Sequence, residues 1–210
     1  MMVIVVIVIL DGMDKCGKTT ISMEVSKRLQ FEYVRFPFRR EIFAEVYKGE
    51  VEPYEAMLLF AYDYNSVLKR LDKKKNYVFD RSFISALLYQ GTQFSERYGL
   101  TFREAVKEIL NIYRPWYSEW VVPDLVFLLK VSPEEFLRRM DMPTDVFEKV
   151  EFQRELYHRV DVLYDILVND TSFSGSEVVL IDTTDKTLDE VKNIIMEKIK
   201  ERILVPPILK

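Results

Sequence analysis

Apolar segments rich in Val and Ile alternate with longer segments of helical spacing along the 210-residue chain. A strand that helices cover on both faces is apolar throughout, and the strongest run, at residues 3–10, has this character. The alternation therefore predicts an α/β fold in which helices flank a parallel sheet. The apolar runs lie at residues 3–10, 33–36, 77–79, 125–131 and 178–181, and the helical patterns lie at 21–29, 54–71, 102–112, 147–167 and 188–203.

The first run, VIVVIVIL, could also belong to an export signal or a membrane helix. Only Met1 and Met2 precede it, Asp11 ends it, and neither a cationic segment nor a small-residue cleavage site flanks it. A transmembrane helix needs about 20 apolar residues, far more than this run contains. We therefore expect a buried strand and no membrane partner.

The chain contains no linker or repeat that would divide it. Its length fits one domain, residues 1–210, with at most a small mobile insert. Pro133, followed by two glutamates, predicts the start of a further helix. Residues 140–146, MDMPTDV, are expected to form a short loop between helices.

Charge and cysteine content narrow the function classes. The net charge of −4 gives no electrostatic argument for nucleic acid or an anionic membrane as a partner. The single cysteine, Cys16, excludes an internal disulfide and favours a reducing, cytoplasmic location. The single histidine, His158, has no cysteine near it in the sequence, so we expect no metal site there.

Residues 12–19, GMDKCGKT, match the phosphate-loop pattern G-x-x-x-x-G-K-[ST]. The motif follows the first predicted strand and opens a helix, so backbone N–H groups and a helix N-terminus would face a polyphosphate. Lys18 would then bridge the β- and γ-phosphates, and the Thr19 hydroxyl would ligate Mg²⁺. The alternative is an ordinary strand–turn–helix connection that contains these glycines by chance.

Other sequence features separate the classes of nucleotide-binding protein. Signalling GTPases normally read guanine with an Asn-Lys-x-Asp motif, and this chain contains no Asn-Lys pair. Mechanical ATPases are usually longer and have several domains. A chain of this length with one phosphate loop is typical of phosphoryl transfer to a small acceptor.

Two basic segments follow predicted strands, at the edge of the sheet where open α/β folds bind ligands. Asp80 could position a metal-bound water or accept hydrogen bonds from the acceptor, and Arg81 could neutralise a transferring phosphoryl group. Arg39 or Arg40 could clamp a monophosphate. The alternatives are a structural ion pair for the first segment and an ordinary basic loop for the second.

Together these segments resemble the thymidylate kinase family of nucleoside monophosphate kinases, along almost the whole chain. The resemblance implies a three-layer P-loop kinase fold with a five-stranded parallel sheet, a short mobile lid at about residues 140–147 and a homodimer. It also implies ATP as the donor, dTMP as the acceptor and Mg²⁺ as the cofactor. The matching residues are DK at 14–15, RFP at 35–37 with Arg39, LLFA at 58–61, DR at 80–81 with Ser85, YQG at 89–91, PDLV at 123–126 and FQ at 152–153, with Phe147 where the family usually has tyrosine.

The resemblance implies a role for each part of the site. Asp14 would accept a hydrogen bond from the sugar of the acceptor, and Lys15 would supply positive charge near the transferring phosphate, because residues 140–146 contain no arginine or lysine. The expected catalytic residues are Lys15, Lys18, Asp80 and Arg81, and the expected Mg²⁺ ligands are Thr19 and, through water, Asp80. The expected ATP contacts are Gly12, Met13, Asp14, Lys15, Cys16, Gly17, Lys18, Thr19, Thr20 and Arg138. The expected acceptor contacts are Asp14, Arg39, Phe60, Tyr64, Arg81, Ser85, Tyr89, Gln90, Phe147 and Gln153.

The departure from the family pattern that matters most for base selectivity is at position 64, and Phe38, where an acid is common, is a further one. The family usually has an arginine four residues after Phe60, where it hydrogen-bonds the base, and this chain has Tyr64. Tyrosine lacks the charge and the forked donors of arginine, so selectivity of about 1–3 kcal/mol per unmatched polar group can be lost. Without the surrounding motifs, Phe60 and Tyr89 would be interpreted as core residues.

We therefore predict an ATP-dependent nucleoside monophosphate kinase, with dTMP as the expected acceptor. A deoxynucleoside kinase is one alternative, although such enzymes usually have Glu-Arg-Ser where this chain has Asp80, Arg81 and Ser82. A non-catalytic nucleotide-binding protein is the other, and the presence of Lys18 and Thr19 together with Asp80 argues against it.

Overall fold

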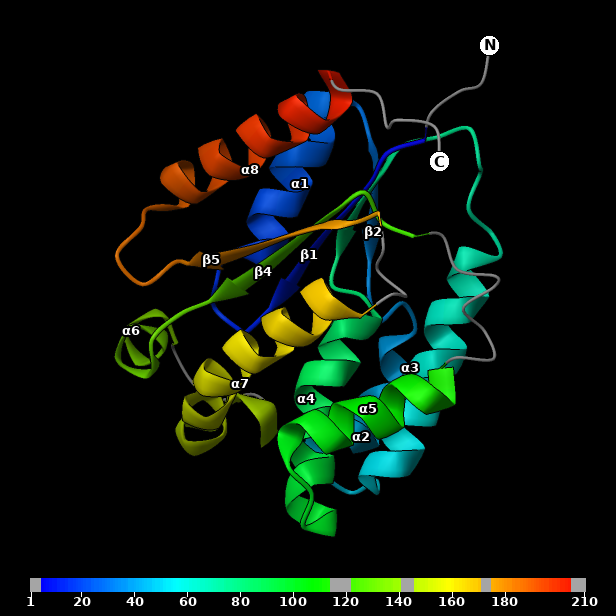
Figure 1. The fold of residues 1–210 in the computed structure, drawn as a ribbon, viewed down its shortest axis with the longest axis vertical. Coiled ribbons are helices and arrows are strands. Elements are labelled where there is room, and N and C mark those ends of the chain that lie inside the picture. The colour runs from blue at the N-terminus through cyan, green and yellow to red at the C-terminus, as the bar shows by residue number, and fades with distance from the viewer. Residues whose placement is uncertain (1–4, 114–121, 141–145, 171–174, 205–210) are drawn as a thin grey trace.

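The sheet is parallel throughout and has the amino-terminal strand at its centre (Figure 1). The computed structural model describes residues 5–113, 122–140, 146–170 and 175–204. The five strands follow the spatial order β2-β3-β1-β4-β5, and every neighbouring pair is parallel, as predicted. Their bounds are β1 (Ile7–Gly12), β2 (Glu32–Arg35), β3 (Tyr77–Asp80), β4 (Leu125–Lys130) and β5 (Glu177–Asp182).

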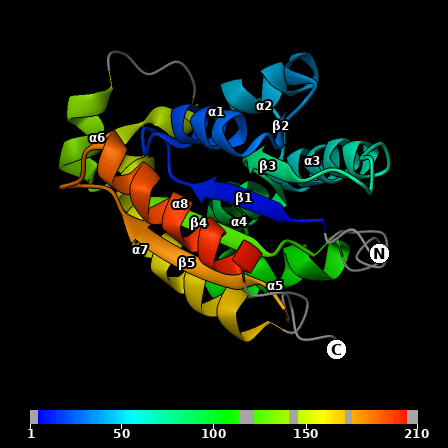
Figure 2. The same ribbon diagram turned by 90° about the horizontal axis from the view of Figure 1, so that it is seen from above.

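Helices cover both faces of the sheet and give the molecule three layers (Figures 1 and 2). Helices α1 and α8 lie on one face, whereas α4 and α7 lie on the other, and α3 and α5 pack against α4. None of the helices in the described ranges is long and apolar enough to cross a membrane. The bounds are α1 (Lys18–Leu29), α2 (Ala44–Lys48), α3 (Pro53–Leu68), α4 (Phe83–Tyr98), α5 (Phe102–Tyr113), α6 (Pro133–Arg139), α7 (Val150–Asn169) and α8 (Leu188–Leu204), with 3-10 turns η1 (Arg40–Phe43) and η3 (Val146–Glu148).

The position of each strand explains its apolar pattern. All six residues of β1 are buried, and Val8 pairs with Val78 of β3 on one side and Leu125 of β4 on the other. The edge strands β2 and β5 are largely half-buried or exposed, so their apolar runs are weaker or shorter. Strand β1 begins at Ile7, whereas residue 3, where the sequence predicts its start, lies outside the described residues.

Helix α4 is the one long element among the described residues that the periodicity did not predict. Twelve of its sixteen residues are buried, because α3, α5, α7 and β1 surround it. A helix that is buried on all sides has no polar face, and hence no alternation of polar and apolar residues to reveal it. Its start is nevertheless well defined, since the Ser82 hydroxyl caps the helix by accepting a hydrogen bond from Ile84 N at 3.1 Å.

The helix start predicted at Pro133 is confirmed. Ser132 caps α6 by accepting a hydrogen bond from Glu135 N at 3.2 Å, and Pro133 occupies the first helical turn. The predicted lid, residues 140–147, follows this helix. Residues 141–145 of that segment lie outside the described residues, whereas Met140 directly follows α6 and Val146 begins η3.

Candidate active site

The connection from β1 to α1 is a tight loop whose glycines are required by geometry. Gly12 has a φ of 114°, and an added Cβ would lie 2.0 Å from the Leu129 carbonyl oxygen of β4. Met13 N donates to that same oxygen at 2.9 Å. Gly17, with a φ of 82°, immediately precedes α1. The predicted phosphate loop is therefore held against the sheet, with the N-terminus of α1 at its end.

Two side chains of the loop point inward. Met13 and Cys16 are buried, and burial raises the pKa of the Cys16 thiol to about 11. The ammonium group of Lys18 lies over the loop and donates to the Met13 carbonyl oxygen. Burial, together with the charge of Arg81, lowers the pKa of Lys18. Met13 and Cys16 therefore anchor the loop in the core, whereas Lys18 lines the cavity.

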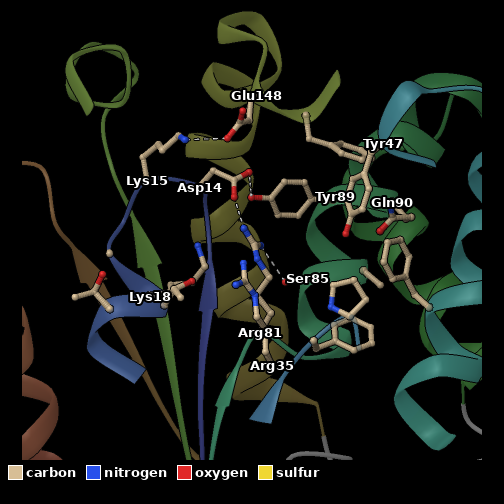
Figure 3. Close-up of a pocket in the computed structure, with 18 of the residues that line it drawn as sticks. Asp14, Lys15, Lys18, Arg35, Tyr47, Arg81, Ser85, Tyr89, Gln90 and Glu148 are labelled. Carbon is tan, nitrogen blue, oxygen red and sulfur yellow. Dashed lines mark hydrogen bonds and ion pairs between the residues drawn. The ribbon is translucent and has the colours of Figure 1, made fainter. Parts of the chain in front are cut away.

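A cavity of about 650 Å³ opens at the carboxyl ends of β1, β2 and β3 (Figure 3). It brings together twelve of the predicted site residues. They come from the phosphate loop and the start of α1, from the connection between β3 and α4, and from α3, α4 and η3. These are Asp14, Lys15, Gly17, Lys18, Thr19, Thr20, Phe60, Arg81, Ser85, Tyr89, Gln90 and Phe147. It also includes residues that were not assigned to the site, namely Arg35, Phe36, Pro37, Ala44, Tyr47, Ala86 and Glu148.

Asp14 is the residue at which the two sides of this cavity meet. Its carboxylate accepts hydrogen bonds from Arg81 Nη2, from the Tyr89 hydroxyl at 2.8 Å and from Gln153 Nε2 at 3.3 Å. Burial alone would raise the pKa of Asp14, but the charges of Arg81 and Lys18 outweigh burial and hold that pKa below its ordinary value. Asp14 is thus an ionised carboxylate at neutral pH.

Arg81 is held firmly in this arrangement. Its φ of 70° is in the left-handed region, which is rare for a residue with a side chain and costs about 1–2 kcal/mol. Besides Asp14, its guanidinium contacts the Ser85 hydroxyl at 3.3 Å and the Gly12 carbonyl oxygen at 3.4 Å, and it lies 5.3 Å from the centre of the Tyr89 ring.

Asp11 holds together the segments that carry Asp14 and Arg81, and the sequence analysis did not assign it to the site. This buried carboxylate accepts hydrogen bonds from the backbone N–H groups of Gly12, Ser82 and Ser85, and from both serine hydroxyls, at 2.5–3.1 Å. It therefore ties the end of β1 to the start of α4. The sequence signal that could have revealed this role is an acidic residue placed directly after a buried apolar strand.

Lys15 has partners on both sides of the predicted lid. Its φ of 59° is again left-handed. Lys15 Nζ lies 3.0 Å from Glu148 Oε1 of η3, and its carbonyl oxygen accepts from Arg139 Nη1 of α6 at 3.3 Å. Lys15 and Glu148 stand at the rim of the cavity in Figure 3.

A family model described as thymidylate kinase matches residues 10–195 of the chain. The chain belongs to the thymidylate kinase family. A probable thymidylate kinase from Methanococcus vannielii is 31% identical over 198 residues, which cover 89% of this chain and 91% of that protein. Another from Methanococcus maripaludis is 31% identical over 209 residues, covering 93% of this chain and 96% of that protein. The predicted family and enzyme class, a nucleoside monophosphate kinase, are confirmed.

Solved structures confirm the fold of this thymidylate kinase family member. Thymidylate kinase from Candida albicans has a TM-score of 0.72 and 20% identity, covering 94% of this chain and 92% of that chain. A deoxyadenosine kinase from M. mycoides has a TM-score of 0.69 and 20% identity, covering 93% of this chain and 98% of that chain. At such low identity the likeness shows the fold alone, and the fold is common to both kinase classes.

Three predicted acceptor contacts of this kinase, Arg39, Tyr64 and Gln153, do not line the cavity. Arg39 Nε donates to Asp63 Oδ1 at 2.9 Å, and its guanidinium lies 4.9 Å from the centre of the Tyr62 ring. Asp63 is fully buried and also accepts from Phe38 N, so it draws Arg39 onto α3 and away from the cavity. The side chain of Arg40, the alternative phosphate clamp, lies outside what the structure describes.

Tyr64 is the second of these contacts. Its ring is buried in an aromatic cluster, with its centre 5.4 Å from that of Phe36 and 5.5 Å from that of Phe83. Burial raises the pKa of its hydroxyl. Tyr64 therefore belongs to the core, and its side chain does not line the cavity.

The part of the cavity that lies beside α3 and α4 is lined by other predicted acceptor contacts. Phe60 lines the cavity while its ring stacks on Phe43, with ring centres 4.4 Å apart and planes 8° from parallel. Gln90 is almost fully buried yet lines the cavity, which places an amide there. Phe147 packs edge-on against Tyr89 at 5.6 Å, and Gln153 lies behind it, donating to its carbonyl oxygen at 2.6 Å.

The predicted donor contact Arg138 is not at the phosphate loop. Its side chain is 80% exposed and pairs with Glu135, whereas Arg139 contacts the Lys15 and Thr183 carbonyl oxygens. Successive residues of a helix point about 100° apart, so only one of two adjacent arginines at the end of α6 can face the loop. Arg139 is that residue.

Thr19 and Asp80 are the two residues that the family resemblance assigns to Mg²⁺, and of the two only Thr19 lines the cavity. Asp80 is buried, its Oδ2 accepts from the Tyr33 hydroxyl at 2.9 Å, and its Oδ1 has no hydrogen-bond partner within the described ranges. The described residues contain no cluster of three or more His, Cys, Asp or Glu side chains that could hold a metal ion.

Proposed function

We propose that this kinase transfers the γ-phosphoryl group of ATP to dTMP, giving dTDP and ADP. An oxygen of the acceptor's phosphate attacks the γ-phosphorus, and the bond from that phosphorus to the bridging oxygen of ADP breaks. The observation that carries the proposal is the position of Asp14. It belongs to the same loop as the phosphate-binding Lys18, yet its carboxylate contacts Arg81 and Tyr89 on the opposite side of one cavity.

On the donor side, the loop supplies backbone N–H groups and the end of α1 for the phosphates of ATP. Lys18 is already inside the cavity, and Lys15 lies at its rim. Thr19 and, through water, Asp80 would hold Mg²⁺, which neutralises phosphate charge when bound. Three cationic groups, those of Lys15, Lys18 and Arg81, would then stabilise the charge on the transferring phosphoryl group.

On the acceptor side, Phe60 supplies an aromatic surface for the base, and the Gln90 amide supplies one donor and one acceptor for its polar edge. Asp14 and Tyr89 lie where the sugar would enter, and each can exchange a hydrogen bond with its hydroxyl. A single amide matches the polar edge of a pyrimidine, so Gln90 takes over the base reading for which Tyr64 is too deeply buried. Phosphoryl transfer needs little beyond such positioning and charge neutralisation.

A coupled assay of ATP consumption with a panel of nucleoside monophosphates tests this function. We expect turnover with dTMP, none with thymidine, and none with the Lys18→Ala variant. Thymidine as the preferred acceptor would instead make the protein a deoxynucleoside kinase. The absence of acceptor-dependent ATP consumption with every monophosphate would refute the proposal.

The homodimer, the single domain over residues 1–210 and the cytoplasmic location stay predictions. The homodimer follows from the family resemblance, and light scattering of the purified protein would test it by its mass. Limited proteolysis would reveal any second folding unit, and fractionation of the source cells would test the location.

A further inference from the structure

Glu148 brings a negative charge into a cavity that is lined by the cationic groups of Lys15, Lys18 and Arg81. Only 11% of its side chain is accessible. A carboxylate can only accept hydrogen bonds, and it repels the oxygens of a phosphate. Any part that Glu148 takes in handling phosphate must therefore be exerted on a cation.

The cation that Glu148 contacts is the ammonium group of Lys15. Lys15 Nζ lies 3.0 Å from Glu148 Oε1, and the two side chains meet above the phosphate loop (Figure 3). The backbone of Lys15 is held as well, because Arg139 Nη1 donates to its carbonyl oxygen at 3.3 Å. Helix α6 therefore holds Lys15 by its backbone, and η3 holds it by its ammonium group.

The turn that carries Glu148 is itself anchored. The ring of Phe147 packs edge-on against Tyr47 of α2 and Tyr89 of α4, with ring centres 6.3 and 5.6 Å apart. The Phe147 carbonyl oxygen accepts from Gln153 Nε2 of α7 at 2.6 Å. Three helices thus fix the residue next to Glu148, whereas a lysine side chain is long and flexible. In this ion pair the carboxylate orients the ammonium group.

We propose that Glu148 is a positioning residue, which holds the Lys15 ammonium group at the cavity rim for the transferring phosphoryl group; this inference rests on the proposed function. A lysine that had to be ordered during the reaction would add an entropic cost to the barrier, and the ion pair orders it beforehand. An ammonium group has three N–H donors, and 31% of the Lys15 side chain is accessible. Donors of Lys15 therefore stay available to phosphate oxygens.

The experiment is a kinetic double-mutant cycle in the full chain, with ATP and dTMP as substrates. It compares wild type, Glu148→Gln, Lys15→Met and the double variant. Glutamine keeps the shape of the glutamate side chain but not its charge, and methionine keeps an unbranched stem but not the ammonium group. For each protein we would measure kcat, both KM values and Tm.

Glu148→Gln should lower kcat about 10- to 100-fold, the effect of a displaced catalytic group. The KM for ATP should be kept or should fall, because a negative charge leaves the cavity and the released ammonium group can pair with the donor phosphates. In the Lys15→Met background the same substitution should change kcat less than about 3-fold, since no ammonium group is left to orient. A purely structural role would instead raise KM and lower Tm in both backgrounds, which would overturn the inference.

Two kinetic results would also overturn it. One is a kcat of Glu148→Gln within about 3-fold of wild type. The other is an equal loss of kcat in both backgrounds, because Glu148 would then act independently of Lys15. A higher Mg²⁺ requirement in both backgrounds would have the same meaning, with the metal as the cation on which Glu148 acts.

Glu24→Gln is the matched control for breaking a glutamate–lysine pair. Glu24 Oε2 lies 2.8 Å from Lys192 Nζ, between α1 and α8, and neither residue lines the cavity. Its kcat should stay within about 3-fold of wild type, because such a pair contributes only to stability. A loss of kcat as large as that of Glu148→Gln would overturn the inference, since the location of the pair would then not matter.

Glu148→Asp covers the case in which the glutamine variant does not fold. Aspartate keeps the charge on a shorter side chain, so kcat should fall only about 3- to 10-fold, and only while Lys15 is present. An unchanged kcat, or a loss that persists in Lys15→Met, would overturn the inference. If wild type does not phosphorylate dTMP, the proposed function fails. If wild type does so and Lys15→Met is slow, but the Glu148 variants have normal kcat, only the role of Glu148 fails.

Discussion

Replacing Lys15 by glycine separates the catalytic role of the phosphate loop from its structural role. Lys15 is in the left-handed region with a φ of 59°, and its ammonium pairs with Glu148 at 3.0 Å. Glycine removes the positive charge near the transferring phosphate. It also adopts the observed backbone conformation without the steric cost that a side chain incurs.

The expected change in stability follows from these two contributions. A left-handed conformation costs a residue with a Cβ about 1–2 kcal/mol, which glycine would recover. The ion pair is partly exposed, with 31% of the Lys15 side chain accessible, and such pairs contribute at most about 1 kcal/mol. The net gain is about 0–2 kcal/mol, which raises Tm by about 0–8 °C for a protein of this size.

Activity should change in the opposite direction. Removing one preorganised group that stabilises transition-state charge typically lowers kcat about 10²- to 10³-fold. The KM for ATP should be kept, because Lys18 and the loop backbone still hold the donor phosphates. The assay is a coupled kinetic measurement with ATP and dTMP, run beside a thermal melt of the same preparation.

Gln30→Gly is the matched control for this change. Gln30 is exposed at the end of α1, with a left-handed φ of 56°, so glycine gives the same backbone gain far from the cavity. Its Tm should rise while kcat is unchanged. An unchanged kcat in Lys15→Gly would refute the catalytic role of this lysine, and a large rise in the KM for ATP would show that it binds the donor instead.

Two further predictions concern the loop and its carboxylate. Gly12→Ala should lower the free energy of unfolding by about 2–6 kcal/mol, because the new Cβ meets the Leu129 carbonyl oxygen and its φ is strained. Gly99→Ala, where a Cβ has open space, should cost only about 1–2 kcal/mol in urea unfolding, and equal losses would contradict the steric argument. The lowered pKa of Asp14 means that its contribution to stability is present above its ordinary pKa of 3.8 and is lost as the pH falls further, through the folded-state pKa. Asp14→Asn should therefore flatten the acid limb of stability against pH, and acid limbs that run parallel in the two proteins would refute this.

The parts of the site that the sequence predicted are those that depend on local geometry. The loop around Gly12 and Lys18 has a fixed spacing because the strand, the turn and the helix are consecutive in the chain. The strand end at Asp80 and Arg81 was recognisable for the same reason. In these cases the elements that position the side chains are their immediate neighbours in the sequence.

The parts that were missed depend on contacts between distant segments. Glu148 reaches Lys15 across more than 130 residues of chain, and no local pattern records that pairing. Arg39 is held away from the cavity by Asp63, a buried acid on α3, and no pattern in the segment around Arg39 indicates that contact. Tyr64 is removed from the cavity by aromatic neighbours on β3 and α4, which the spacing of its own helix does not reveal.

Asp11 has a consequence for the entropy of the reaction. Its one buried carboxylate joins β1, which leads into the donor loop, to the start of α4, which carries acceptor-side residues such as Tyr89. The distance between the places for the two nucleotides is therefore established when the chain folds. Bringing two reactants into alignment costs entropy in a bimolecular reaction. Here the fold fixes the phosphate loop and the start of α4 relative to each other before either nucleotide binds, so less of that cost remains for the reaction.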